Sequence, residues 1–231
     1  TARSDTGLKN VSEEISGTFS VKVKIISKDL SKNNSAQELF DEIISEGFNV
    51  DILINNAGFG SYGNFSESEL DNDLDMIYLN ITSLVILTRL FLNEMLKRNS
   101  GRIMNVASTA AFQPGPFMAL YYASKAFVLS FSEAVDEEIA DSSVTISCLC
   151  PGPTNTGFQE RAGMHKIKLV NKKLAGMMSA EKVAGIGYNG LMKGKRIIIP
   201  GKINWLVSQA VRFTPRNLVT KIVSYINTEL S

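Results

Sequence analysis

The stretch STAAFQPGPFMALYYASK, residues 108–125, joins a predicted strand to a predicted helix. The apolar run before it, Arg102–Ala107, has the length of a buried strand. A loop rich in proline and glycine follows at Gln113–Pro116, and a helix is predicted from about Leu120 to Ala140. A strand, a loop and a helix in this order form the repeating unit of a sheet that is covered by helices.

The same alternation of short apolar runs and longer helical patterns extends in both directions along the chain. Further strands are predicted at Val21–Ile26, Asp51–Asn55, Val144–Cys150 and Ile197–Ile199. Further helices are predicted over residues 6–16, 35–46, 70–91 and 179–192, with a capping-box pattern at Ser66 and Glu69. The pattern predicts one α/β domain over residues 1–231, a three-layer, doubly wound parallel sheet of Rossmann type.

Composition excludes several classes of protein. The 231 residues have 44% hydrophobic and 20% charged residues and a net charge of +1, as in ordinary globular domains. Without a basic excess or a transmembrane-length apolar run, neither a nucleic-acid partner nor membrane association is expected. Cys148 and Cys150 would share one strand face as buried thiols. We expect no metal site, and a cytoplasmic location.

Tyr121 and Lys125 are four residues apart at the start of the predicted helix, so their side chains share a face. A free tyrosine, with a pKa of about 10, exchanges protons poorly near neutral pH. A fixed ammonium group nearby would favour the phenolate and lower that pKa. The pair suits a general acid or base, although two unrelated residues on a helix surface could have the same spacing.

Two other polar residues could act with this pair. Ser108 directly follows a strand, thirteen positions before Tyr121, and could either polarise a substrate carbonyl or cap a turn. Asn80 interrupts the apolar stretch Ile77–Leu87, and a buried asparagine needs hydrogen-bond partners. Those partners could be structural, or Asn80 could hold a water molecule near the site.

Asn55-Asn56-Ala57-Gly58 follows the strand Asp51–Asn55. Asparagine and glycine tolerate positive φ angles, and alanine and glycine let a ligand approach the backbone closely. The tetrapeptide is therefore either an ordinary tight turn or a ligand contact. Open parallel sheets bind ligands at the carboxyl ends of their strands, which is where this turn and Ser108 are predicted.

Taken together, these motifs resemble the classical short-chain dehydrogenase/reductase family. The resemblance rests on Asn-Asn-Ala-Gly after a strand, an asparagine in the next helix, the serine, Tyr-x-x-x-Lys, and Pro151-Gly152 after the following strand. It extends from residue 1 to about residue 200. The order and spacing of the set are specific, although each motif alone is not. The resemblance implies an oxidoreductase that acts on CH–OH groups.

The resemblance also implies a role for each residue. Tyr121 would donate or accept the proton, Lys125 would lower its pKa and bind the nicotinamide ribose, Ser108 would orient the substrate carbonyl, and Asn80 would support a water relay. Cofactor contacts are implied on the adenosine side at Asp29, Leu30, Asn56, Ala57 and Gly58, and beside the nicotinamide at Pro151, Gly152, Thr154 and Thr156.

Arg3 bears on the choice of cofactor. Thr1-Ala2-Arg3-Ser4 resembles the end of the family's second strand, where an acidic residue binds a ribose 2′-hydroxyl and an arginine favours a 2′-phosphate. No acidic residue occurs before Asp5. NADP is therefore the expected cofactor, and NAD the alternative.

The family opens with a strand, a Gly-rich turn and a helix that hold the cofactor phosphates, and no residues of this sequence match that unit. In the strand order 3-2-1-4-5-6 the first strand lies between the second and the fourth, so a gap in the sheet is implied. We expect that the unit is omitted from this sequence. A disordered front segment and a truncated gene product are the alternatives.

Residues 154–178 are predicted to form a loop region on the substrate side. Its apolar residues predict an adaptable pocket for a small apolar substrate: Phe158, Met164, Leu169, Met177 and Met178. Its lysines form either a solvated face or an anion site: Lys166, Lys168, Lys172 and Lys173. His165 is expected to be exposed.

The tail, residues 203–231, has apolar positions at helical spacing. We expect this amphipathic tail to pack on its own fold or on a second subunit of a homodimer or homotetramer, rather than on a membrane.

Two functions remain open. One is a carbonyl reductase or alcohol dehydrogenase. The other is a non-catalytic nucleotide-binding sensor or scaffold on the same fold. A non-catalytic member would be expected to lack part of the catalytic set, whereas Asn80, Ser108, Tyr121 and Lys125 are all present, which favours the enzyme.

Overall fold

The computed structural model describes residues 1–164 and 177–228, and its centre is a parallel sheet. The strand order is β1-β2-β3-β6, with bounds Ile52–Asn55, Gly101–Val106, Val144–Leu149 and Ile197–Ile198. β2 lies between β1 and β3, and its Asn105 is in register with Asn55 and with Cys148. The predicted doubly wound parallel sheet is confirmed.

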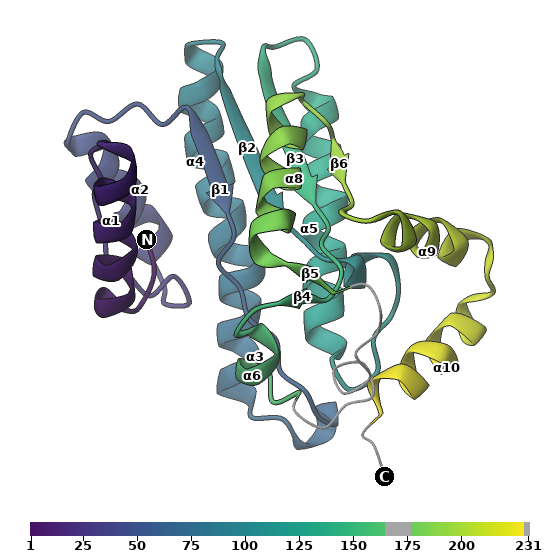
Figure 1. The fold of residues 1–231 in the computed structure, drawn as a ribbon. Coiled ribbons are helices and arrows are strands. Elements are labelled where there is room, and N and C mark those ends of the chain that lie inside the picture. Colours follow the sequence, from purple (N-terminus) through teal and green to yellow (C-terminus); the bar gives the residue numbers. More distant parts are fainter. Residues whose placement is uncertain (165–176, 229–231) are drawn as a thin grey trace.

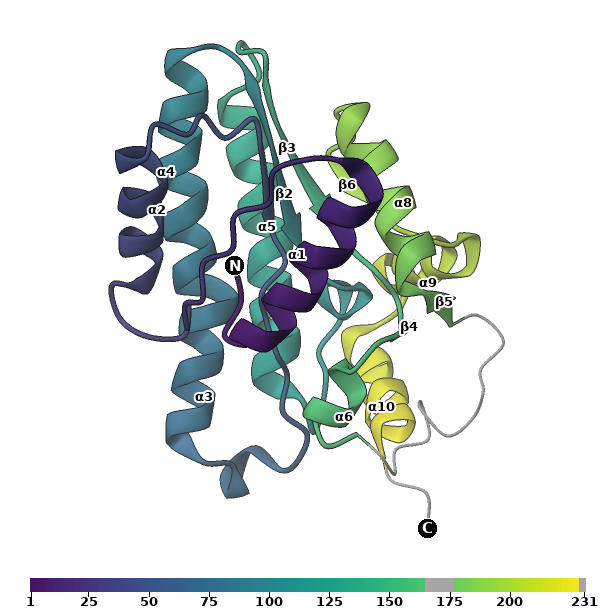
Figure 2. The same cartoon turned by 60° about the vertical axis from the view of Figure 1, so that its left-hand side comes forward.

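Helices cover both faces of this sheet (Figures 1 and 2). α2 (Ser35–Ser45), α4 (Leu84–Lys97) and α5 (Ala119–Glu138) pack on one face, and α8 (Ala180–Met192) packs on the other. Successive side chains of a strand point to opposite faces. Ile103 therefore joins the core with α2 and α4, while Met104 joins the core with α8.

The helix that carries Asn80 is continuous but not uniform. α3 (Leu70–Ile77) passes through a π-helical turn, η2 (Tyr78–Ser83), into α4. Such turns are rare and often occur at functional sites, and this one contains Asn80, which is buried. The predicted capping box is wrong, because Ser66 lies in a short 3-10 turn, η1 (Phe65–Glu67), and α3 begins after Glu69.

By length and composition, the joined helix Leu70–Lys97 is apolar enough to cross a membrane, which the sequence reading did not expect. The same stretch supplies core residues. Met76, Phe91 and Met95 are buried, and α4 packs against β1 and β2. Its apolar composition therefore has an explanation within the fold.

The segment before β1 departs from the prediction. α1 (Asp5–Phe19) forms as expected, but Val21–Ile26 is not a strand, and the isolated bridge between Ala2 and Ser27 is the only sheet pairing found there among the described residues. A strand needs a partner along its length, and here the Thr1–Arg3 segment pairs at one residue alone. β1 is bonded to β2 and to no other described strand.

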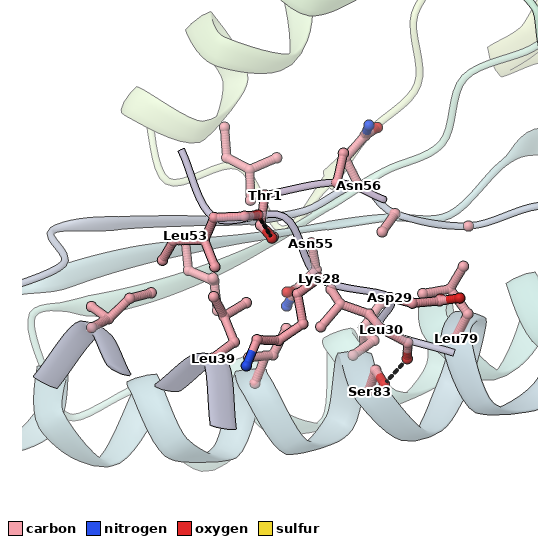
Figure 3. A pocket seen from close by; sticks show the side chains of 18 of the residues that line it. Thr1, Lys28, Asp29, Leu30, Leu39, Leu53, Asn55, Asn56, Leu79 and Ser83 are labelled. Carbon is pink, nitrogen blue, oxygen red and sulfur yellow. Dashed lines mark hydrogen bonds between the residues drawn. The ribbon is translucent and has the colours of Figure 1, made fainter. Parts of the chain in front are cut away.

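A cavity of about 630 Å³ separates this segment from the free edge of β1 (Figure 3). Thr1 and Leu30 line it from the amino-terminal segment, Leu53 and Asn55 line it from β1, and Leu79 lines it from the helix. The gap in the sheet that the family resemblance implied is at this place.

The carboxyl-terminal part consists of short strands and helices. β4 (Thr154–Asn155) pairs with β5 (Met178–Ser179), and α6 (Phe158–Arg161) lies between them in sequence. The helical tail is confirmed as two helices, α9 (Lys202–Phe213) and α10 (Arg216–Asn227). Predictions for these residues lie outside the described ones: His165, Lys166, Lys168, Leu169, Lys172 and Lys173.

Candidate active site

A second cavity, of about 650 Å³, lies at the carboxyl ends of the central strands. Ser108 lines it from the end of β2, Tyr121 and Lys125 line it from the first turns of α5, and Pro151 lines it from the end of β3. The structure therefore brings together residues that the sequence separates by more than forty positions.

Lys125 is buried at the base of this cavity. Its Nζ donates a hydrogen bond of 2.8 Å to the carbonyl oxygen of Val106, and it lies 5.8 Å from the centroid of the Tyr121 ring. Burial lowers the pKa of Lys125 to about 8, since desolvation disfavours the ammonium form. Much of its charge remains at neutral pH.

Tyr121 keeps its proton firmly. Burial raises the pKa of Tyr121 to about 12, and a hydrogen bond with the Ser108 side chain offsets part of that rise. The expectation that Lys125 lowers this pKa is therefore wrong for this structure. The amino group of Lys125 is directed to the Val106 carbonyl, and desolvation of the phenol is the largest effect.

Ser108 fulfils the capping role proposed for it, and its role toward a substrate carbonyl stays a prediction. As the N-cap of a 3-10 turn, η3 (Thr109–Phe112), its Oγ accepts a hydrogen bond of 3.1 Å from the Ala110 N–H. The same hydroxyl donates a longer bond of 3.4 Å to the Pro151 carbonyl oxygen and interacts with Tyr121. Because the cap fixes its rotamer at the cavity wall, the hydroxyl is positioned for a substrate oxygen.

Asn80 fastens the loop after β1 to α5. Its Oδ1 accepts a hydrogen bond of 3.1 Å from the Phe59 N–H, and its Nδ2 donates to the Phe59 carbonyl at 2.9 Å and to Ser124 Oγ at 3.1 Å. Asn80 therefore has the structural hydrogen-bond partners that were one of its two predicted roles. A Cβ on Gly58 would lie 2.9 Å from Asn80 Oδ1 and 3.5 Å from Lys125 Nζ, so Asn80 stands beside the lysine. The water relay stays a prediction.

The predicted adenosine-side residues all line the first cavity: Arg3, Asp29, Leu30, Asn56, Ala57 and Gly58. Ser83 Oγ donates a hydrogen bond of 2.6 Å to the Leu30 carbonyl, which fixes this wall to the helix (Figure 3). Burial alone would raise the pKa of Asp29. Hydrogen bonds from the Ser31 N–H and hydroxyl, with the nearby charge of Arg3, bring it below its usual value.

The predicted nicotinamide-side residues line the second cavity: Pro151, Gly152, Thr154 and Thr156. Asn56 and Gly58 line both cavities, so the two are adjacent. A Cβ on Gly152 would lie 2.5 Å from the side-chain amide of Asn204 in α9, so a larger residue at this wall would displace that side chain.

These residues fit the two ends of an extended nicotinamide dinucleotide. The adenosine wall has a cation at Arg3 for a phosphate, and small residues at Ala57 and Gly58 permit close approach to the backbone. The other wall has Lys125 for ribose hydroxyls. The Gly-rich phosphate turn that the family resemblance implies is not among residues 1–164 and 177–228.

The sequence reading missed a buried polar network beneath the site. Asn55 Nδ2 donates to Thr88 Oγ1 at 3.0 Å and to Asn105 Oδ1 at 2.9 Å, and Asn105 Nδ2 donates to Ser132 Oγ at 3.0 Å. It ties β1 and β2 to α4 and α5. An asparagine in the middle of the apolar strand Arg102–Ala107 was the available signal.

Cys148 and Cys150 are both buried, with their Sγ atoms 3.8 Å apart, as predicted for one face of a strand. No group of three or more potential metal-binding side chains is found in the part of the chain that the structure describes.

Comparison with known proteins identifies the family. Residues 1–166 match the family model described as short chain dehydrogenase. The 17-beta-hydroxysteroid dehydrogenase type 3 of Mus musculus is 37% identical over 156 residues, which cover 64% of this chain and 49% of that protein. The very-long-chain 3-oxoacyl-CoA reductase of Anas platyrhynchos is 35% identical over 156 residues, or 65% and 49%. The chain spans about half the length of these relatives.

Solved structures share the fold. A structure of a 7beta-hydroxysteroid dehydrogenase matches with a TM-score of 0.83 and 20% identity, over 96% of this chain and 84% of its own. A short-chain dehydrogenase from Sphingobium yanoikuyae in complex with NADPH has a TM-score of 0.79 and 24% identity, over 91% and 82%. One from Burkholderia phymatum in complex with NAD has a TM-score of 0.78 and 23% identity, over 100% and 87%. With this fold, this motif set around one cavity and the family match, the chain belongs to the short-chain dehydrogenase family.

Proposed function

We propose that this protein is an NADP-dependent oxidoreductase that interconverts a carbonyl and an alcohol group on a small apolar substrate. The observation that carries the proposal is the meeting of Ser108, Tyr121 and Lys125 on one cavity that adjoins the adenosine-side residues. A proton donor, an oxyanion partner and a ribose-binding cation are the groups this chemistry needs from the protein.

When bound, the nicotinamide supplies or accepts the hydride. In the reducing direction, Tyr121 gives its proton to the carbonyl oxygen as negative charge develops there, and solvent returns the proton. A phenol with a pKa of about 12 holds its proton in the resting protein at neutral pH. The Ser108 hydroxyl donates a hydrogen bond to the same oxygen and orients it toward Tyr121.

An apolar substrate is supported by the wall of the second cavity, which includes Met118, Phe158, Met164, Met177 and Val223. Methionine side chains adapt their shape to a ligand. The names of the two relatives, a hydroxysteroid dehydrogenase and a very-long-chain 3-oxoacyl-CoA reductase, support the apolar character of the substrate but not its small size.

The preference for NADP rests on Arg3, because the similar solved structures include both an NADPH and an NAD complex. The Arg3→Ala substitution removes the cation expected to meet the 2′-phosphate. We expect NADPH to bind about tenfold to a hundredfold more weakly, on the scale of one charge-assisted contact, with NADH binding little changed. Cofactor fluorescence titration of both forms measures this. Equal losses for the two cofactors would contradict the assignment.

Turnover is tested separately, by following NADPH oxidation with hydrophobic ketones as substrates. Consumption of NADPH with formation of the alcohol is the expected result. NADPH binding without turnover on any ketone would instead support the sensor or scaffold alternative.

A further inference from the structure

The two carboxyl-terminal helices form an arm beside the edge of the sheet where β6 lies (Figure 1), and this arm has exposed apolar residues. In α9 the exposed fractions of Ile203, Leu206 and Phe213 are 68%, 62% and 88%. These residues share one side of the helix, since positions three, four and seven apart lie on one face. α10 adds Leu218 and Ile222, both about half exposed.

α9 is inverted relative to an ordinary surface helix, which turns its apolar stripe toward the core. The side of α9 that faces the protein has two polar residues, Asn204 and Ser208, beside Val211, which packs on the core. Ser208 is 3% exposed, and Asn204 Nδ2 donates a hydrogen bond of 2.7 Å to the Pro200 carbonyl. Packing within the described chain therefore gives no reason for the outward apolar stripe.

The stretch of chain that includes this face, from Lys182 to the last described residue, carries charge of one sign. From Lys182 to Thr228 the sequence has eight Lys and Arg and no Asp or Glu, although the whole chain has a net charge of only +1. Four of the eight are exposed on the arm itself: Lys202, Arg212, Arg216 and Lys221. Among the described residues none of these four forms an ion pair, whereas Arg196 pairs with Asp136 and Glu137.

We propose that the α9–α10 arm is a docking surface for an anionic lipid bilayer. The apolar stripe enters the boundary between headgroups and acyl chains, and the four cations meet headgroup phosphates. The sequence predicted that the tail packs on its own fold or on a second subunit, and one face of the tail does pack on the fold. For the other face we revise the expectation that the protein does not bind a membrane.

Charge disfavours a second copy of the chain as the occupant of this face. An isologous contact would bring two sets of unpaired cations together without an acidic partner. A bilayer that contains anionic lipid offers both the apolar environment and the opposite charge.

Docking would also have a consequence for the catalytic cavity, because Asn204, Ser208 and Val223 of the same arm line it. An apolar substrate dissolved in the bilayer would then lie close to its binding site. This consequence rests on the proposed function, whereas docking itself does not.

Trp205 makes the proposal testable without a label, since it is the only tryptophan of the chain and is 54% exposed on the arm. The intact protein is mixed with vesicles of phosphatidylcholine alone, or of phosphatidylcholine with phosphatidylserine. We expect a blue shift of Trp205 emission and co-sedimentation with the anionic vesicles, and much weaker binding to the neutral ones.

Two double variants separate the two contributions. Leu206→Ser with Phe213→Ser removes the apolar stripe and should abolish the shift on both vesicle types. Arg212→Gln with Arg216→Gln should weaken binding to anionic vesicles roughly 30-fold, because each cation near such a surface contributes about 1 kcal/mol. Matched controls at exposed positions far from the arm, Leu70→Ser and Arg89→Gln with Lys97→Gln, should bind like the wild type.

The proposal is overturned if wild-type protein gives no shift with excess anionic vesicles, or if the controls lose binding as much as the arm variants. Sedimentation velocity without lipid tests the rival occupant. A dimer that the Leu206→Ser and Phe213→Ser pair dissociates, with no vesicle binding, would assign the face to a second copy. NADPH binding by the same samples shows whether the proposed function fails independently.

Discussion

At the candidate active site, burial shifts the pKa values of two ionisable side chains in opposite senses. Desolvation raises the pKa of Tyr121 to about 12 and lowers the pKa of Lys125 to about 8, so both groups favour their neutral forms more than in water. In the free protein Tyr121 is therefore protonated at neutral pH. Lys125 loses its proton more easily than a lysine in water does. A bound substrate oxygen and ribose would change both environments.

Tyr121→Phe removes one oxygen atom and should leave the packing of the cavity unchanged. Loss of a general acid typically costs a factor of about 100 to 10,000 in turnover, so kcat should fall by that amount while NADPH binding is retained. Steady-state kinetics with the best ketone substrate measures this. Tyr188→Phe, at an exposed tyrosine of α8, is the matched control. Unchanged turnover in Tyr121→Phe would disprove the assigned role.

Lys125→Met should abolish activity and yet stabilise the fold near neutral pH. The pKa of Lys125 is about 8 in the folded protein and 10.5 in the ordinary state, so the unfolded chain binds more protons between these pH values. The free energy of unfolding due to Lys125 therefore rises with pH through that window, and below pH 8 the full penalty for the buried charge is present.

At pH 7 this penalty is about 3 kcal/mol, against which the lost hydrogen bond to Val106 is worth about 1 kcal/mol. Urea unfolding of both proteins at several pH values measures the difference. Lys125→Met should be more stable at pH 7, and the gap should narrow as the pH rises above 8. A gap that is independent of pH would show that Lys125 does not titrate in this window.

At the scale of the elements, periodicity and motif spacing predicted most of the helices and strands. They failed where the formation of a strand depends on pairing with a neighbouring strand. β2, β3 and α5 were predictable because each has its own apolar pattern. The segment Val21–Ile26 has a strand-like pattern but only the bridge at Ser27, since pairing depends on a neighbour that no local pattern encodes. The four catalytic candidates were predicted from the order and spacing of the motifs together with the family resemblance. The network around Asn105 was not, because its members are single polar residues on four elements.

Asn105→Ala tests the importance of that network. The substitution leaves Asn55 Nδ2 with one partner fewer and Ser132 Oγ without its donor, all within the core. Leaving buried polar groups unpaired costs about 1 to 3 kcal/mol each, so stability should fall by about 3 kcal/mol. Denaturant unfolding measures it, with exposed Asn155→Ala as the control. If Asn105→Ala loses no more unfolding free energy than the Asn155→Ala control, then water replaces the missing amide.

At the scale of the whole molecule, two adjoining cavities lie along one sheet, one lined by the catalytic candidates and the other by the adenosine-side residues. The catalytic cavity is formed by β2, β3, α5 and the arm, and among these β2, β3 and α5 are joined by extensive pairing and packing. The adenosine-side cavity lies between β1 and the segment before it, and the one bridge described in that segment joins Ala2 to Ser27 within the segment itself. We therefore expect the catalytic cavity to be stable by itself, and the adenosine-side cavity to depend on what occupies it.

NADPH should couple the two halves of the protein, because a dinucleotide long enough to reach both Arg3 and Lys125 contacts both cavities. At a concentration of about 100 times its Kd, a ligand that binds only the folded state adds about 2.7 kcal/mol to stability. Hydrogen exchange should slow across residues 1–30 and β1 as well as around Ser108 and Tyr121, while α8 stays unchanged. Adenosine monophosphate alone should protect only the first region. If NADPH protects the catalytic cavity without residues 1–30, then Arg3 and Asp29 do not bind the cofactor, and the choice between NADP and NAD must be made elsewhere in the protein.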